Sequence, residues 1–186
     1  MASGTALLIL DMQNDIMSFH GGDEHIKHVV HTIADLAGWA RRSSIPVIYS
    51  RVAYRSSYVD GLPGMPILKE RHLLDERRPG SAIIDELKPA DDDVVITRKR
   101  SGGFYNNELE VILRSLRVET LLFTGMSTAR VVESTVREAH CRDFRNVVVS
   151  DGCAATSMEL HDNALRSMAD FFATIMTSAE VKKAFA

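Results

Sequence analysis

Residues 120–135 read TLLFTGMSTARVVEST, an apolar run that stops at a glycine and restarts with a helical pattern. Residues 120–123 have the character of a buried strand, and Gly125 predicts a tight turn after it. Ser127 and Thr128 are favourable N-cap residues for the helix that follows. The stretch therefore predicts a strand, a glycine turn and a helix in immediate succession.

A turn of this kind indicates a ligand-binding or catalytic site. In α/β proteins, anions and reacting groups bind where a buried strand leads into a helix, because the first N–H groups of the helix are unpaired and the helix dipole is positive there. The position that would hold a nucleophile at this turn is Val131, whose side chain is chemically inert. The sequence therefore predicts a site that lacks the expected nucleophile.

Outward from this stretch, short apolar runs alternate with helical patterns along the whole chain. The expected strands are residues 6–10, 45–52, 93–97, 120–123, 146–151 and 173–176. The expected helices are residues 23–42, 81–87, 107–116, 127–141 and 158–172, with a last helix capped by Ser178. This alternation predicts an α/β fold with a single parallel sheet of about six strands and helices on both faces. We expect one domain that spans residues 1–186.

Three charged or turn segments directly follow expected strands. Asp11 follows the first strand, the cluster 98–100 follows the third, and the turn 125–131 follows the fourth. In a parallel sheet the carboxyl ends of all strands meet at one edge, so we expect these segments to lie at the same edge. Taken alone, Asp11 could be a turn or capping aspartate, and the basic cluster could be a solvated surface.

Composition limits the classes of partner. Apolar residues make up 45% of the 186, and the formal charge of −3 gives no general attraction to nucleic acid or anionic membrane. No apolar run approaches the ~20 residues that cross a bilayer, and residues 6–10 are too short for a signal sequence. We therefore expect a cytoplasmic protein that binds a small-molecule substrate and neither nucleic acid nor membrane.

Few residues suggest a metal site. Cys141 and Cys153 are the only cysteines and have no CxxC spacing. His25, His28 and His31 lie three apart on an expected helix, but on or near its polar side. We expect no metal and no cofactor.

Several motifs resemble the isochorismatase-like hydrolases, a superfamily that includes nicotinamidases, N-carbamoylsarcosine amidase, ureidoacrylate hydrolase and isochorismatase. They are LILDMQND at 8–15, the basic cluster with Phe104 beyond it, TGMST at 124–128 with EST at 133–135, and SDGCAA at 150–155. The resemblance covers nearly the whole chain in the same order and spacing. It implies a Rossmann-like parallel sheet of six strands with the first strand central, and a homodimer or homotetramer.

Hydrolases of that family use an aspartate, a lysine and a cysteine. Carried over by position, the aspartate is Asp11 and the lysine position falls on Arg98, with Lys99 as the alternative if the turn is one residue shorter. The cysteine position falls on Val131. An arginine could neutralise Asp11 and hold an anion, but it cannot lose a proton near neutral pH.

The same resemblance and the strand ends suggest where a substrate binds. A non-prolyl cis peptide bond of the family would fall at Gly125-Met126 or Met126-Ser127. The candidate substrate-binding residues are Gln13, Tyr54, Phe104, Met126, Ser127, Thr128 and Arg130. Among them, Gln13 could orient water or substrate, and the backbone N–H groups after Ser127 could bind a carboxylate or carbonyl oxygen.

The chemistry follows from the missing thiol. Val131 cannot form a thioester, which disfavours covalent amide hydrolysis. Isochorismatases, which are similar in lacking the cysteine, cleave a vinyl ether, and one carboxylic acid can protonate its alkene carbon. We therefore expect cysteine-independent acid/base hydrolysis of a small carboxylate-bearing molecule, centred on Asp11. Two alternatives stay open: a degenerate member that only binds a ligand or partner, and an amidohydrolase with an unexpected nucleophile.

Overall fold

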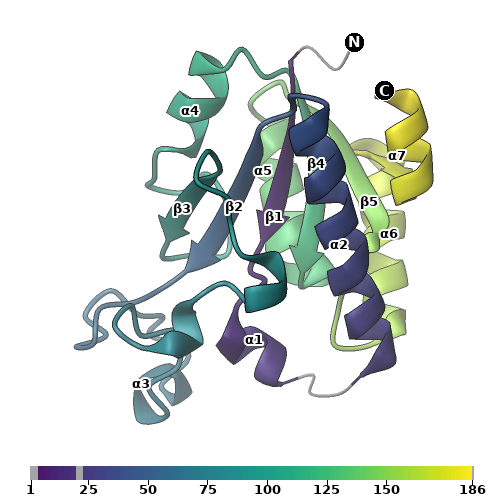
Figure 1. Ribbon diagram of the computed structural model, residues 1–186. Helices are drawn as coiled ribbons and strands as arrows, with labels where there is room; N and C mark the ends of the chain where they lie inside the picture. Colours follow the sequence, from purple (N-terminus) through teal and green to yellow (C-terminus); the bar gives the residue numbers. More distant parts are fainter. Residues whose placement is uncertain (1–3, 20–22, 186) are drawn as a thin grey trace.

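A computed structural model of the chain describes residues 4–19 and 23–185, and shows one sheet of parallel strands (Figure 1). The strands are β1 (Thr5–Leu10), β2 (Val47–Val52), β3 (Val94–Arg98), β4 (Thr120–Met126), β5 (Arg145–Ala154) and β6 (Thr174–Met176). Their order across the sheet is β3-β2-β1-β4-β5-β6, so β1 and β4 are the central pair. The predicted six-stranded parallel sheet is confirmed.

Helices cover both faces of the sheet, as predicted. On one face lie α2 (Glu24–Arg42) and α7 (Ser178–Ala184), and on the other lie α4 (Leu109–Ser115), α5 (Glu133–His140) and α6 (Met158–Phe171). Shorter elements gather near the strand arrowheads, where Figure 1 shows α1 (Asn14–Ser18) and α3 (Ile67–Glu70). The carboxyl edge of the sheet is therefore the edge with the most irregular chain around it.

The alternation of side chains along β1 explains why the sheet needs two layers of helices. Ala6, Leu8 and Leu10 pack into the hydrophobic cluster under α4, α5 and α6, whereas Leu7 and Ile9 pack into the cluster under α2. Each of these side chains is at most 1% exposed. Fully burying a leucine or isoleucine contributes ~1.5–3 kcal/mol, so this strand holds both layers together.

The predicted helix over residues 81–87 is wrong. The structure has two separate 3₁₀ turns, η1 (Pro79–Ser81) and η2 (Asp85–Leu87). Ile84 between them is extended, buried in the core, and donates its N–H to the carbonyl of Met12 at 3.0 Å. This tertiary hydrogen bond replaces the bond that a continuous helix would make.

The predicted N-cap of the last helix is also displaced by one residue. Thr177, rather than Ser178, caps α7, and it forms a capping box with Glu180. The Ser178 hydroxyl instead donates to Asp151 within β5, at 2.7 Å. Two side chains therefore fix the start of this helix against the sheet.

The loop between β2 and η1 contains one helical turn, α3, and folds over the carboxyl edge. Tyr54, Leu68 and Leu74 form a small hydrophobic cluster there together with Val52. The carboxylate of Asp15 in α1 accepts a 2.6 Å hydrogen bond from the N–H of Leu74. The loop is thus attached to the sheet and to α1. In the two described ranges, no helix is long and apolar enough to cross a membrane.

Candidate active site

Asp11 is the first residue after β1 and lies where the chain leaves the sheet. Its φ is 56°, a left-handed conformation that aspartate tolerates better than most residues, and strained backbone of this kind clusters at functional sites. Its N–H donates to the carbonyl of Ser50 in β2 at 2.9 Å. The side chain is buried and lines a cavity at the carboxyl edge.

Arg98, the last residue of β3, reaches across β2 to form a buried ion pair with Asp11. Its Nε donates to the hydroxyl of Ser50 at 3.2 Å, and Nη1 donates to the backbone carbonyl of Arg100. Lys99 has a different environment: its Nζ donates to the carbonyl of Ala53 at 2.5 Å and pairs with Asp60 at 3.1 Å. Of the two predicted alternatives, Arg98 is the cation that contacts Asp11.

Burial dominates the electrostatics of this pair. Removal from water raises the pKa of the Asp11 carboxyl above its ordinary value, and the attraction of the Arg98 guanidinium only partly opposes the rise. Guanidinium groups in proteins do not act as proton donors near neutral pH. Asp11 is therefore the group of this pair that can give or take a proton.

The predicted end of the fourth strand at residue 123, followed by a glycine turn, is wrong: β4 continues through Gly125 to Met126, with a shift in its pairing to β5 between Phe123 and Gly125. Gly125 has a φ of 122°, and a Cβ there would lie 2.1 Å from the carbonyl oxygen of Leu10. Only glycine lets β4 pass this close to β1. The Met126-Ser127 peptide bond is cis, at one of the two positions suggested by the resemblance.

Beyond this bond the chain forms a π-helical turn, η3 (Thr128–Val132), which runs into α5. The prediction of an ordinary α-helical start is therefore wrong at this point. Val131 is 3% exposed, belongs to the core cluster under α5 and also lines the cavity. Val131, on which the resemblance places the nucleophile, is therefore an apolar part of the cavity wall.

The cavity has a volume of about 270 Å³. This is just below the ~300–1,000 Å³ typical of ligand sites, which suits a small metabolite better than a nucleotide or peptide. Seven of the candidate residues line it: Asp11, Tyr54, Arg98, Met126, Ser127, Arg130 and Val131. These residues come from the ends of β1, β2, β3 and β4, which are four neighbouring strands of the sheet.

Gln13 does not line the cavity, although it lies two residues after Asp11. Its amide nitrogen, Nε2, donates to the carbonyls of Val52 and Ser81 at 2.8 Å each, and Oε1 accepts from the N–H of Val52 at 2.8 Å. The side chain is completely buried. These contacts use its polar atoms to join β2 to η1 and leave none directed to a substrate.

Gln13→Ala should lower the free energy of unfolding by about 1–3 kcal/mol, because it leaves buried backbone groups of Val52 and Ser81 without partners. Urea denaturation measures the change. Asn14→Ala is the matched control, since the Asn14 amide makes one exposed hydrogen bond, to Pro79. Equal stability losses in the two variants would contradict the structural role of Gln13.

Three other candidates lie behind the cavity wall. Phe104 stacks on Phe144 with 5.8 Å between ring centroids. Thr128 is fully buried, and its hydroxyl lies 2.8 Å from Nδ1 of His161 in α6. Lys99, described above, faces the loop. These residues support the segments that carry the site and do not line the cavity.

Neither cysteine is placed to attack a substrate. Cys153 is fully buried in β5 with Sγ 3.7 Å from the carbonyl oxygen of Phe123, and burial raises the pKa of its thiol to about 12. Cys141 is exposed at the end of α5, some ten residues or ~15 Å along the helix from Val131. Neither residue lines the cavity.

Sequence reasoning missed several cavity residues in loops or short helices. Among them, Ile16 and Phe19 come from α1 and its end, Ser101 from the loop after β3, and Thr156 from the segment after β5. Ser101 directly follows the basic cluster and Thr156 follows a strand end, so proximity to the carboxyl edge was a usable signal for both. Ile16 and Phe19 carried no such signal.

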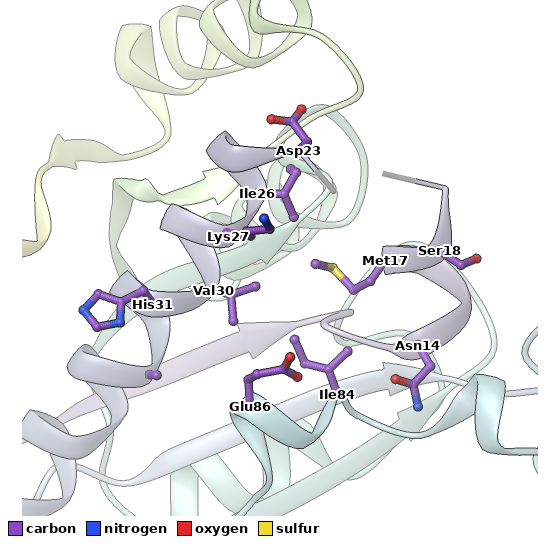
Figure 2. A pocket seen from close by; sticks show the side chains of 11 residues that line it. Asn14, Met17, Ser18, Asp23, Ile26, Lys27, Val30, His31, Ile84 and Glu86 are labelled. Atoms are coloured by element: carbon purple, nitrogen blue, oxygen red, sulfur yellow. The ribbon is translucent and has the colours of Figure 1, made fainter. Parts of the chain in front are cut away.

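A second, larger cavity of about 670 Å³ lies between α1, the first half of α2 and η2. Figure 2 shows Met17, Ile26, Val30 and Ile84 pointing toward one another across it, while His31 points away. None of the candidate catalytic residues lines it. The buried Asp11–Arg98 pair lines the smaller cavity, so size alone does not make the larger one the active site.

The fold and this edge define an α/β protein whose ligand site lies at the carboxyl ends of its central strands. A family model described as "Isochorismatase domain" matches residues 5–180. The chain is 30% identical to the isochorismatase family protein YecD of Escherichia coli O157:H7 over 190 residues. The aligned region covers 98% of this chain and 97% of YecD. The chain therefore belongs to the isochorismatase family.

Two further comparisons agree. A ureidoacrylate amidohydrolase, RutB of Methylorubrum extorquens, is 31% identical over 206 residues, covering 98% of this chain and 83% of RutB. The crystal structure of a cysteine hydrolase from Pseudomonas syringae pv. phaseolicola 1448A superposes with a TM-score of 0.91 at 26% identity, covering 100% of this chain and 93% of that one. These relatives support a hydrolase that acts on small molecules.

Proposed function

We propose that the protein hydrolyses a small carboxylate-bearing molecule by an acid/base mechanism centred on Asp11, without a covalent intermediate. The observation that carries the proposal is the buried Asp11–Arg98 pair, which lines the same cavity as Val131. The family resemblance places the nucleophile at Val131, whose side chain cannot attack a substrate. Burial raises the pKa of Asp11, which suits a group that must deliver a proton. Arg98 holds the carboxyl in place and stabilises its ionised form after the proton has left.

A vinyl ether is the substrate bond that this chemistry favours. Asp11 delivers its proton to the terminal alkene carbon, and the ether carbon becomes an oxocarbenium ion. Water adds to that carbon, and a proton from the water returns to Asp11. The resulting hemiketal loses the alcohol, which takes a proton as the C–O bond breaks, and a ketone remains. The sum is addition of one water molecule with cleavage of one C–O bond, and no thiol is used.

The test compares two substrates with the same protein. Isochorismate presents a vinyl ether, and ureidoacrylate presents the amide that the RutB relatives hydrolyse. We expect pyruvate release from isochorismate and no product from ureidoacrylate, because an amide carbon requires a stronger nucleophile than this site holds. Hydrolysis of ureidoacrylate alone would overturn the proposal.

Alkylation of the thiols should leave the rate of hydrolysis unchanged. N-ethylmaleimide should modify Cys141, which is exposed, and spare Cys153, whose thiol is buried with a pKa raised to about 12. Mass spectrometry of the intact protein counts the modified thiols while activity is followed. A loss of activity that parallels modification, and that Cys141→Ser prevents, would restore a thiol mechanism.

The second candidate function is ligand binding without turnover. The observation that favours it is the buried, apolar Val131 at the nucleophile position. A protein that binds small carboxylates saturably but turns over neither vinyl ethers nor amides would belong to this class. Binding measurements therefore complement the activity test.

A further inference from the structure

Two arginine side chains at the cavity have no carboxylate partner in the described part of the chain. Arg130, in η3, is exposed, and its guanidinium makes no hydrogen bond or ion pair with another described residue. Arg100, after β3, uses only Nη1, which donates to the backbone carbonyls of Asp60 at 2.9 Å and Lys99 at 2.7 Å. The cavity therefore has guanidinium N–H donors that only a ligand or water can satisfy.

A third donor lies on the Arg100 side. Tyr54 is 2% exposed and lines the cavity, and its hydroxyl has no hydrogen-bond partner among residues 4–19 and 23–185. Burial raises the pKa of this hydroxyl, while Arg100 and then Arg98 are the charges that oppose the rise. The Tyr54 hydroxyl therefore stays protonated and can donate a hydrogen bond near these cations. The hydroxyl oxygen is not enclosed by the protein, so water or a ligand in the cavity can accept its hydrogen bond.

The strand order separates the two arginines. Arg100 follows β3 and Arg130 follows β4, and both β2 and β1 lie between those strands. Asp11 follows β1 and is neutralised locally by Arg98, so it does not compensate either of the other two cations. Two positive groups thus approach one cavity from its two sides, with the proton donor between them.

We propose that Arg130 is a specificity-determining residue that selects small substrates with two carboxylate groups. Arg130 holds one carboxylate, and Arg100 with the Tyr54 hydroxyl holds the other, so that the bond between them faces Asp11. The inference rests on the proposed function for the reaction itself, but the binding preference stands on the cavity alone. The volume of about 270 Å³ restricts the carbon skeleton between the two acids to a few atoms.

Binding of diacids and their monoamides to the full-length native protein tests the inference. Succinate and glutarate are compared with succinamate and glutaramate by isothermal titration calorimetry. Each pair differs by one negative charge and has nearly the same shape. We expect each diacid to bind about tenfold or more tightly than its monoamide, since hydrogen bonds to a charged group are among the stronger ones in proteins.

Arg130→Gln should reduce the ratio of diacid affinity to monoamide affinity to about one. Arg130→Lys should retain part of the preference, because lysine keeps the charge but lacks the planar guanidinium. Arg117→Gln is the control for net charge, since Arg117 is exposed in the turn before β4 at the opposite edge of the sheet. Arg117→Gln should keep the native preference. Arg130 is exposed, so its substitution leaves the fold intact.

Three results would overturn the inference: equal or no saturable binding of diacids and monoamides to the native protein, an unchanged preference in Arg130→Gln, or tighter binding of inorganic phosphate than of either diacid. These probes contain no vinyl ether, so the measurement does not depend on turnover. A protein that prefers diacids but does not release pyruvate would retain this inference and lose the proposed hydrolysis. Pyruvate release without a preference for diacids would support the proposed hydrolysis and contradict this inference.

Discussion

Asp11→Asn should reduce kcat for vinyl ether hydrolysis by about a hundredfold to ten-thousandfold, the range that a general acid contributes. Asparagine has the same shape as aspartate and can still accept a hydrogen bond from Arg98, but it has no proton to deliver. Because the variant keeps the cavity and both flanking arginines, diacid binding should change little. The measurement is kcat and KM for the native protein and the variant, with calorimetric binding as the check on the fold.

The pH dependence of the native enzyme provides an independent test of the same role. A general acid acts in its protonated form, so kcat should fall as pH rises through the pKa of Asp11. Burial raises that pKa, which places the fall at a higher pH than a solvent-exposed aspartate would give. Asp92→Asn, at an exposed carboxylate, should reproduce the native profile. A native rate that rises with pH, or an undiminished kcat in Asp11→Asn, would exclude Asp11 as the acid.

The fold was predictable because its signals are local and repeated. Buried strands such as β1 consist of continuous apolar residues, and the intervening helices have clear apolar stripes. The shared carboxyl edge then follows from the parallel arrangement alone. This is why the proximity of Asp11 to the cluster 98–100 could be inferred before any side chain was placed.

The details of the site depend on tertiary contacts that no local pattern encodes. The strand pairing decides which of Arg98 and Lys99 contacts Asp11. β3 pairs with β2 so that Arg98 lies opposite Val52, and the side chain of Lys99 then faces the loop, where it pairs with Asp60. The Gln13 side chain forms hydrogen bonds with Val52 and Ser81, which lie 39 and 68 positions further along the chain. Its orientation could not be read from its place beside Asp11.

Arg98→Met should be the most destabilising of the substitutions considered, with a loss of about 3–5 kcal/mol in the free energy of unfolding at neutral pH. The guanidinium is buried and contacts Asp11, Ser50 and the backbone of Arg100. Methionine fills much of the volume but leaves the Asp11 carboxylate without a counter-charge. Lys99→Met is the matched control and should cost less. Its ion pairs with Asp60 and Glu76 are partly exposed, and such pairs are worth ~0–1 kcal/mol; its other contact is a hydrogen bond to the carbonyl of Ala53.

The loss in Arg98→Met should depend on pH with a definite sign. In the native protein the pKa of Asp11 is already raised by burial, and removing Arg98 removes the charge that opposes the rise. A carboxyl whose pKa is higher in the folded than in the unfolded state binds more protons when folded, so stability falls as pH rises between the two pKa values. Because the folded-state pKa of Asp11 is raised further in the variant, stability falls over a wider pH range in the variant than in the native protein. Its deficit relative to the native protein should therefore be small near the ordinary aspartate pKa and grow toward neutral pH.

A double-mutant cycle separates this charge effect from lost packing. If the cost of Arg98→Met comes from an uncompensated carboxylate, it should shrink when Asp11 is already asparagine, with a coupling of about 1–3 kcal/mol, and the pH dependence should disappear with it. If it comes from packing, the cost should be the same in both backgrounds and at every pH. Urea denaturation of the four proteins at acidic and neutral pH decides between the two. Additive, pH-independent losses would show that Arg98 acts as a space-filling residue, and would contradict its proposed role of stabilising the ionised form of Asp11 after the proton has left.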